Sequence, residues 1–476
     1  MPTQTRSTSS CVVCKPRYAT KRNPKNRTRG DEVAKIAEAL GMPLMPWQRL
    51  VVDTALEVDA EGTPIYSQVT VQVPRQSGKS SLVLALMVHR ALLWGGRQSI
   101  AYNAQDLKSS RAKMLVDYAP VIEASPIKSA LRRIYLGNGA ESIVFRNSSR
   151  IDTFAKTASA AHGRTLDLAI IDEARFDFDD SREAAYSPAM VTRKDSQLWI
   201  LSVAGDAASV YFRKKVEDGR RLVSDKTQSS RAFFDWSAPD DSDWTDPEVW
   251  AKTIPSLGYT QTEKAIKQRF ETALADGKEN TFRQEYLCQW MAIENAMIPD
   301  RYLVPCLDPA TAPSGRICFG IDVALDRSSG AICVADETGR VELIDARDGV
   351  TWIVDRALDL YRKHRAPLVV DGYSPANSLV DRLEAGGVPV VRYALRDMTA
   401  AVGSFYDAIL EGNIRIRPDQ HLEAALRTAK KKQVASGWLW MRTDVDVDIS
   451  PLFAATLAYY HATNRRAPES RRSTIF

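Results

Sequence analysis

Residues 68–81, Q-V-T-V-Q-V-P-R-Q-S-G-K-S-S, decide the fold of the first half of the chain. A strand-like run leads into Gly78-Lys79-Ser80, and an apolar helical run follows, which is the order of a phosphate-binding loop. In such a loop Gly78 allows close approach, Lys79 supplies charge for the phosphates and Ser80 offers a hydroxyl to Mg²⁺. The glycine expected at the start of the loop is Val73, so the stretch alone leaves the nucleotide site an open question.

A second motif strengthens the nucleotide interpretation. Residues 166–174, L-D-L-A-I-I-D-E-A, predict a buried strand that ends in Asp172-Glu173. This pair suits a Walker B motif, in which Asp172 holds Mg²⁺ through water and Glu173 polarises the attacking water. The alternative is an acidic turn after a buried strand. Ser202, in L-S-V-A-G-D, either senses the γ-phosphate or is simply a small residue at a strand end.

The segments around these motifs alternate between strands and helices. Helices are expected at 80–94 and 106–118 and, after the sheet, at 244–253, 262–276 and 280–290. The expected strands are 67–73, 98–103, 143–146, 150–154, 167–172 and 197–203. Fully apolar strands interleaved with helices favour a mainly parallel sheet covered on both faces. The fold class is therefore α/β.

The chain length of 476 residues predicts two large domains. Repeated prolines in 291–316 break the periodicity and indicate a linker. In chain order, the expected segments are a basic disordered tail at 1–30, an ATPase domain at 31–290 with a helical subdomain at about 240–290, the linker, a second domain at 317–462, and a basic disordered tail at 463–476.

Charge and cysteine content limit the class of protein. The net charge of +5 is concentrated in the two tails, which hold +8 and +3, so the body carries about −6. A nucleic-acid partner would therefore need a local basic track or the tails. Six scattered cysteines are too few for a disulfide framework. No apolar run is long enough for a membrane span or a secretion signal, so we expect a cytoplasmic location and no membrane partner.

The second domain carries acidic residues at strand ends. Asp322 ends F-G-I-D on the first strand of an expected hairpin, and Asp371 ends A-P-L-V-V-D. Asp446 and Asp448 precede an apolar helix at 451–462. A single aspartate after a strand is usually a turn or a helix cap. Three in this order are typical of an RNase H-like nuclease, whose carboxylates hold two metal ions about 3.5–4 Å apart.

Five stretches together resemble the ATPase half of the large terminase subunit of tailed bacteriophages. They are P-W-Q-R-L at 46–50, R-Q-S-G-K-S at 75–80, I-I-D-E-A at 170–174, L-S-V-A-G at 201–205 and F-R-Q-E-Y-L-C-Q-W at 282–290. In that family the loop departs from the common form and has an arginine at its third position, here Arg75, so Val73 is expected. The resemblance adds Gln76 and Ser77 to the nucleotide-binding loop.

The resemblance also implies roles for residues outside the loop. Trp47 and Gln48 would contact adenine, Arg75 would sense or stabilise the phosphates, and Ser202 would couple hydrolysis to motion. Arg164, in H-G-R-T-L-D, is the candidate for an arginine finger that reaches a neighbouring subunit, and an ordinary loop arginine is the alternative.

The same family carries an RNase H-like nuclease as its second half, so the resemblance covers about residues 44–462. Asp322 and Asp371 match well. Asp448 is the preferred third ligand, with Asp446 in reserve and with an alignment that puts Ser450 in its place still open. Asp326 is a candidate auxiliary ligand. Three lysines, Lys430, Lys431 and Lys432, are expected to cap a helix and either meet DNA phosphates or complement the helix dipole.

The function implied by the resemblance is that of a viral DNA-packaging motor subunit. ATP hydrolysis, with Mg²⁺, would move double-stranded DNA into a procapsid, and an endonuclease with two Mg²⁺ or Mn²⁺ ions would cut concatemeric DNA. Implied partners are the portal protein, a small terminase subunit and further copies of the chain in a ring, with five copies expected, docked transiently on the procapsid in the host cytoplasm. The alternatives are a helicase or repair ATPase with a structural C-terminal domain, and a non-enzymatic DNA-binding adaptor.

Overall fold

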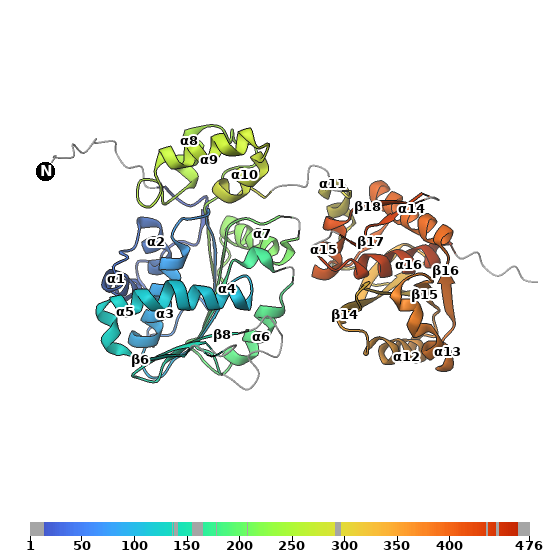
Figure 1. Cartoon of the computed structure of the whole chain (residues 1–476), viewed down its shortest axis with the longest axis horizontal. Coiled ribbons are helices and arrows are strands. Elements are labelled where there is room, and N and C mark those ends of the chain that lie inside the picture. Colours follow the sequence, from blue (N-terminus) through green and yellow to red (C-terminus); the bar gives the residue numbers. More distant parts are fainter. Residues whose placement is uncertain are drawn as a thin grey trace, which may run out of the picture. The chain divides into compact units, whose positions relative to one another are not determined.

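A computed structural model gives the structure of the chain. It describes residues 14–135, 137, 141–154, 165–177, 179–206, 208–290, 297–434, 437–443 and 447–464. The chain divides into two compact units, residues 1–291 (unit 1) and residues 292–476 (unit 2), and each is an α/β structure in its own right (Figure 1). Among the described helices, none has the length and apolar character needed to cross a membrane.

The described residues of unit 1 form a nine-stranded sheet in the order β1-β11-β4-β10-β9-β5-β8-β7-β6. The run from β11 to β8 is parallel, and β1, β7 and β6 pair antiparallel at the edges. The strands are β1 (Tyr18–Ala19), β4 (Gln68–Gln72), β5 (Ser99–Asn103), β6 (Leu131–Tyr135), β7 (Ser142–Phe145), β8 (Arg150–Thr153), β9 (Leu168–Asp172), β10 (Gln197–Ser202) and β11 (Arg231–Asp235). The prediction of a mainly parallel sheet is confirmed.

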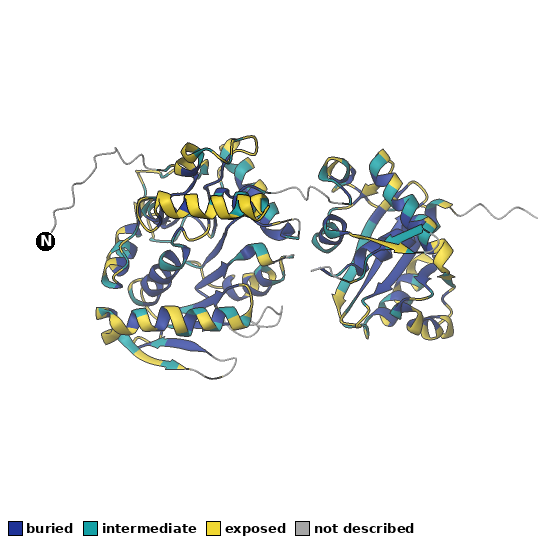
Figure 2. Ribbon diagram, turned by 45° about the horizontal axis from the view of Figure 1, so that its top comes forward, coloured by how far each residue is buried: buried dark blue, intermediate teal, exposed yellow. Residues whose placement is uncertain are grey.

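Helices cover both faces of this sheet because its central strands are apolar on both sides. In β9, Leu168 and Ile170 belong to one core, whereas Ala169 and Ile171 belong to the other. The first face carries α1 (Gly30–Ala39), α2 (Pro46–Ala55), α3 (Lys79–Leu93), α4 (Leu107–Ala112), a π-helix (Lys113–Tyr118) and α5 (Ala119–Ala124). The second face carries α6 (Ser181–Met190) and α7 (Val210–Ser224). The central strands are the most buried part of the unit (Figure 2).

The expected helical segment before the boundary is present as α8 (Pro247–Thr253), α9 (Glu263–Ala275) and α10 (Glu279–Leu287). These helices share a small apolar core that includes Trp250, Ile266 and Phe282. Only Ile266 of α9 is buried, so most of that helix faces solvent.

The N-terminal segment differs from the disordered tail expected at 1–30. Residues 14–30 belong to unit 1: β1 pairs with β11, and β2 (Arg27–Thr28) pairs with β3 (Glu57–Val58). The carboxylate of Glu57, which is fully buried, accepts hydrogen bonds from the backbone N–H of Asn23 at 2.8 Å and from Asn26 Nδ2 at 2.6 Å. A distant buried acid therefore orders this polar segment, which local composition cannot reveal.

The described residues of unit 2 form a six-stranded sheet in the order β16-β15-β12-β13-β14-β17. The expected hairpin is β12 (Ile317–Val323) and β13 (Ser329–Asp336), followed by β14 (Arg340–Asp348), β15 (Leu368–Asp371), β16 (Val390–Tyr393) and β17 (Arg415–Ile416). The strand β15 lies parallel to β12, with Ile321 opposite Val370. Asp322 and Asp371, each one residue further along, therefore leave the same edge of the sheet.

Two layers of helices enclose this sheet. One core contains α14 (Leu395–Glu411), α15 (Gln420–Thr428) and α16 (Ser450–Asn464), and the other contains α12 (Ile353–His364) and α13 (Val380–Ala385). Gly320 in β12 lets α16 approach closely, since a Cβ built there would lie 2.0 Å from the Ala454 carbonyl oxygen. This contact fixes the start of α16 near the end of β12.

Two further segments differ from the sequence expectations. The 291–316 segment contains α11 (Asp300–Leu303), and Ile298, Leu303 and Cys306 are buried in the core of unit 2, so part of the expected linker belongs to that unit. The lysines expected to cap a helix lie after α15, which ends at Thr428. Lys431 and Lys432 belong instead to β18 (Lys431–Val434), which pairs with β19 (Gly437–Trp440).

Candidate nucleotide and metal sites

The phosphate-loop sequence adopts a left-handed turn between β4 and α3. Gly78 has φ +90°, and a Cβ at that position would meet the Met45 Cε atom at 2.5 Å. Both features require glycine. Gln76 also has a positive φ, and the Ser77 side chain is buried. Lys79 and Ser80 open α3, so the loop leads directly into a helix N-terminus, the arrangement that binds phosphate in other proteins.

Trp47 and Gln48 support this loop. The Trp47 indole N–H donates to the Ser77 carbonyl at 3.0 Å, and Gln48 Nε2 donates to the Gly78 carbonyl at 2.8 Å. Both side chains are buried. Their polar groups therefore hold the loop backbone, next to the nucleotide site at which the resemblance expects them.

The Walker B pair lies against the phosphate-loop lysine. Lys79 Nζ is 3.2 Å from Glu173 Oε1. Burial acts to raise the pKa of Glu173, but Lys79 and Arg175 outweigh it and hold that pKa below its usual value. Glu173 has φ +53°, an uncommon conformation for a non-glycine residue and one often found at functional sites. Two residues that lie far apart in the chain thus form one charged site.

Asp172 is buried beside Glu173 and is held by a residue that the sequence motifs did not include. The Tyr102 hydroxyl, from β5, donates to Asp172 Oδ2 at 3.1 Å. Burial and the neighbouring Glu173 raise the pKa of Asp172 to about 6, although Lys79 opposes the shift. The ring of Tyr118, from the π-helix, packs edge-on against Tyr102 with centroids 5.4 Å apart.

A second unexpected pair, Arg175 and Glu285, links the two motifs to α10. Arg175 Nη1 lies 2.9 Å from Glu285 Oε1, and Arg75 Nη1 lies 2.6 Å from Glu285 Oε2. Ser202 Oγ accepts from the Arg175 backbone N–H at 3.2 Å. The loop arginine and the serine that ends β10 therefore both join the network around Glu173. The sequence hint was Glu285 inside the quoted F-R-Q-E-Y stretch. Arg164, the candidate finger, lies outside the described residues.

In unit 2, Asp322 and Asp371 face one guanidinium. Arg442 donates to both oxygens of Asp322, at 2.6 and 2.8 Å, and its Nη2 lies 3.6 Å from Asp371 Oδ2. Asp322 is fully buried, and burial raises its pKa although Arg442 opposes the shift. The structure thus brings the two predicted acids together, with an arginine that the sequence motifs did not single out.

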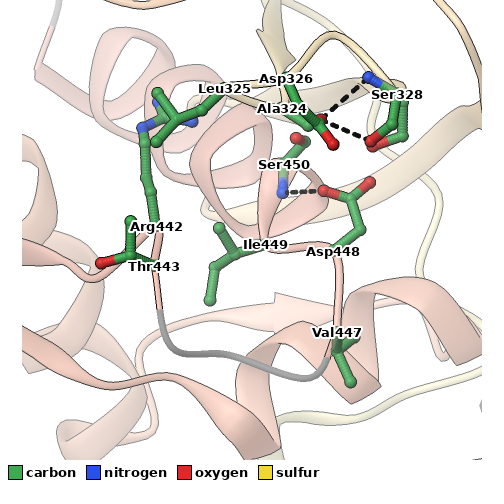
Figure 3. Close-up of a pocket in the computed structure, with 11 residues that line it drawn as sticks. Ala324, Leu325, Asp326, Ser328, Arg442, Thr443, Val447, Asp448, Ile449 and Ser450 are labelled. Atoms are coloured by element: carbon green, nitrogen blue, oxygen red, sulfur yellow. Dashed lines mark hydrogen bonds between the residues drawn. The ribbon is translucent and has the colours of Figure 1, made fainter.

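Asp448 lies at a pocket of about 390 Å³ that Arg442 also lines (Figure 3). Its Oδ1 accepts from the Ser450 backbone N–H at 2.9 Å, so it caps α16. Asp326 lines the same pocket, and its Oδ1 accepts from the Ser328 backbone N–H at 3.0 Å. Ser450, the alternative third position, is buried at the start of the helix. Asp446 falls outside the described residues.

The carboxylates suit a divalent metal in kind but are not gathered around one point. Within the described ranges, no three His, Cys, Asp or Glu side chains lie close enough together to hold an ion. The reason is visible in the contacts: Arg442 takes the cation position at Asp322, and Asp448 is used as a helix cap. Oxygen ligands are what Mg²⁺ and Mn²⁺ prefer, so the carboxylates fit a divalent ion in their chemistry, although they are not yet gathered around one.

Comparisons with known proteins agree with this arrangement. Residues 71–302 match the family model described as "Terminase large subunit, T4likevirus-type, N-terminal". No curated protein matches the chain. The large terminase of bacteriophage HK97 has 18% sequence identity and a TM-score of 0.55, with 91% of this chain and 100% of that chain covered.

Two other solved structures are less similar. A large terminase from a thermophilic bacteriophage has 12% identity and a TM-score of 0.39, covering 88% of this chain and 98% of that chain. The large terminase nuclease of the thermophilic phage G20c has 17% identity and a TM-score of 0.30, covering 35% of this chain and 97% of that chain. Of these three structures, the HK97 protein alone is similar enough to support the fold assignment.

Fold and site together define a class: a phosphate-loop unit with a mainly parallel sheet, joined to a second α/β unit with acidic strand ends. Residues 71–302 thus carry the N-terminal part of the terminase large-subunit family, and the chain as a whole has the fold of the HK97 large terminase.

Proposed function

We propose that this protein hydrolyses ATP in unit 1 to drive double-stranded DNA into a procapsid, and cuts concatemeric DNA in unit 2. The observation that carries the first half is the ion pair between Lys79 and Glu173, 3.2 Å apart. It joins a phosphate-binding lysine to a carboxylate suited to activating water. The second half is supported by Asp322 and Asp371 at one sheet edge.

In this proposal each side chain of the nucleotide site has a defined role. The loop N–H groups around Gly78 bind phosphate, with Trp47 and Gln48 fixing the loop from behind. When phosphate attracts Lys79, Glu173 is released to accept a proton from water. Ser80 and Asp172 are suited to holding Mg²⁺, which would supply charge neutralisation on the β- and γ-phosphates.

Two arginines are proposed to stabilise the transferring phosphoryl group. Arg75, whose side chain is 58% exposed, would exchange its ion pair with Glu285 for a γ-phosphate. Arg164 is proposed as a finger that completes the site of a neighbouring subunit. Ser202 is proposed to report the state of the site to β10, because its Oγ accepts from Arg175.

In unit 2, Asp322, Asp371 and Asp448 are proposed to hold two Mg²⁺ or Mn²⁺ ions. Those ions would activate water and stabilise the leaving oxygen of a DNA phosphodiester. The protein's own contribution is to hold the first two carboxylates side by side on β12 and β15, and the third at the start of α16. Asp326 is proposed as an auxiliary ligand from the same pocket.

The partners are part of the same proposal. They are double-stranded DNA, the portal protein, a small terminase subunit and further copies of the chain in a five-membered ring. Packaging by this protein takes place in the host cytoplasm, during transient docking on the procapsid. The match of residues 71–302 to the terminase large-subunit model is what supports these partners.

The decisive experiment measures ATP turnover and Mn²⁺-dependent plasmid cleavage on the same preparations of the full chain. We expect Lys79→Ala to lower ATP turnover by about 100-fold or more and Asp322→Asn to abolish cleavage while ATP turnover persists. Lys252→Ala and Asp381→Asn, at exposed positions, are the matched controls.

Wild-type cleavage by Asp322→Asn would refute the nuclease and favour a helicase or repair ATPase. Unchanged ATP turnover in Lys79→Ala would refute the ATPase and favour a DNA-binding adaptor.

A further inference from the structure

Arg442 occupies the place between the proposed metal ligands of unit 2. It lies just after β19, and both of its terminal nitrogens donate to Asp322, at 2.6 and 2.8 Å. The second of them also faces Asp371 at 3.6 Å. The guanidinium carbon lies 3.5 Å from the centre of the ring of Phe453, a residue of α16. The arginine is therefore held by ionic contacts on one side and by an aromatic face on the other.

This contact meets an electrostatic need. Asp322 is fully buried, and Asp371 is nearly so. Two buried carboxylates side by side repel each other and are costly to desolvate unless a cation accompanies them. Arg442, with 14% of its side chain exposed, supplies that charge in the geometry that a planar guanidinium fits best.

The same geometry excludes a second cation. Both oxygens of Asp322 are engaged by Arg442, and a divalent ion ligated there would lie within a few ångströms of a guanidinium. Like charges at such a distance in a buried site repel strongly. The pocket of about 390 Å³ that Arg442 lines leaves room for the guanidinium to move away from Asp322 (Figure 3).

We propose that Arg442 is the resident counter-cation of the nuclease centre and must leave Asp322 before that carboxylate can ligate a divalent ion. Arg442 then sets the metal affinity of the centre, and any contact that attracts the guanidinium away favours metal binding. This inference rests on the proposed nuclease function, but it concerns metal occupancy rather than cleavage.

The test is a direct titration of the full chain with Mn²⁺ by calorimetry, without nucleotide or DNA. The variants are Arg442→Gln, Arg442→Lys and, as a matched control, Arg362→Gln at an exposed position of α12. Asp322→Asn supplies the background from other sites. We expect Arg442→Gln to bind Mn²⁺ at least tenfold more tightly than the wild type and Arg442→Lys to be intermediate, since lysine cannot engage both oxygens at once.

Thermal unfolding provides a second readout. In EDTA, Arg442→Gln is expected to melt below the wild type, because the carboxylates lose their partner. Added Mn²⁺ should raise its melting temperature by more than it raises that of the wild type. If Arg442→Gln does not fold, Arg442→Lys carries both measurements.

Two negative results are distinguishable. In the first, the wild type binds Mn²⁺ at a site that Asp322→Asn removes, but the Arg442 variants bind Mn²⁺ no more tightly than the wild type. This result overturns the inference about Arg442 and does not contradict the nuclease function. In the second, neither the wild type nor either Arg442 variant shows Mn²⁺ binding that depends on Asp322. This result refutes the proposed metal site and, with it, the inference about Arg442.

Discussion

Arg175 and Glu285 form an ion pair of 2.9 Å, and the other oxygen of Glu285 binds Arg75 at 2.6 Å. One carboxylate on α10 therefore joins the phosphate loop to the turn that carries Glu173. This links the helical segment of unit 1 to the nucleotide site through side chains that lie more than 100 positions apart.

Glu285→Ala should weaken unit 1 and its ATPase together. Arg175 is mostly buried and would lose its main partner, which we expect to cost about 1–3 kcal/mol in the free energy of unfolding. Urea denaturation and steady-state ATP turnover measure the two effects. The control is Glu279→Ala, which removes an exposed acid from the same helix. Equal unfolding free energies and equal ATP turnover in the two variants would show that the Glu285 ion pairs contribute to neither.

Gly78→Ala should abolish nucleotide binding by a steric route. The added Cβ would meet Met45 Cε at 2.5 Å, in addition to the strain of φ +90°. Gly96→Ala is a matched control, because that residue has φ +64° but nothing within 4 Å of a new Cβ. Fluorescent ATP-analogue titration should show binding lost in the first variant and kept in the second. Normal binding by Gly78→Ala contradicts the assigned loop.

Gly320→Ala should disable unit 2 while leaving unit 1 active. Its Cβ would lie 2.0 Å from the Ala454 carbonyl oxygen, so α16 would have to move away from β12 and carry Asp448 with it. Gly403→Ala, in α14 with open space around it, should be neutral or slightly stabilising. Plasmid cleavage and ATP turnover, measured side by side, check this. Full cleavage by Gly320→Ala would mean that the position of α16 is unimportant.

His89 predicts a pH dependence of stability in unit 1. Burial lowers its pKa from 6.5 to about 4, although Glu32 opposes the shift. The unfolded chain therefore takes up a proton near pH 6.5 that the folded chain resists, so stability falls as pH decreases from 6.5 towards 4, by up to about 3 kcal/mol.

His89→Gln should flatten this dependence in urea titrations at pH 7 and pH 5, whereas His364→Gln, at an exposed position, should not. If the wild type and His89→Gln lose the same stability between pH 7 and pH 5, a group other than His89 causes the pH dependence.

Much of the fold was predictable because local pattern and tertiary structure agree. Fully apolar strands such as β9 and the helix after Lys79 carry their own signals, and Gly78 marks the turn between strand and helix. The sequence put Asp322 on the first strand of an expected hairpin and Asp371 at the end of A-P-L-V-V-D, and the parallel pairing of β12 with β15 brings the two together.

The sequence could not reveal contacts between side chains that only folding brings together. Arg175, Glu285 and Arg442 matter because of contacts with residues far away in the chain, and no spacing encodes those contacts. The ordering of residues 14–30 likewise depends on the buried Glu57. The bond from the Trp47 indole N–H to the Ser77 carbonyl is another contact that no sequence pattern indicated.

The central claim is ATP-driven DNA packaging, and DNase protection of linear DNA in the presence of procapsids and ATP tests it most directly. We predict protected DNA with the wild-type chain, none with Glu173→Gln, and protection close to wild type with Asp322→Asn, because translocation of a pre-cut DNA needs unit 1 chemistry alone. Protection by Glu173→Gln at the wild-type level, or none by a wild-type chain that hydrolyses ATP, would contradict the account.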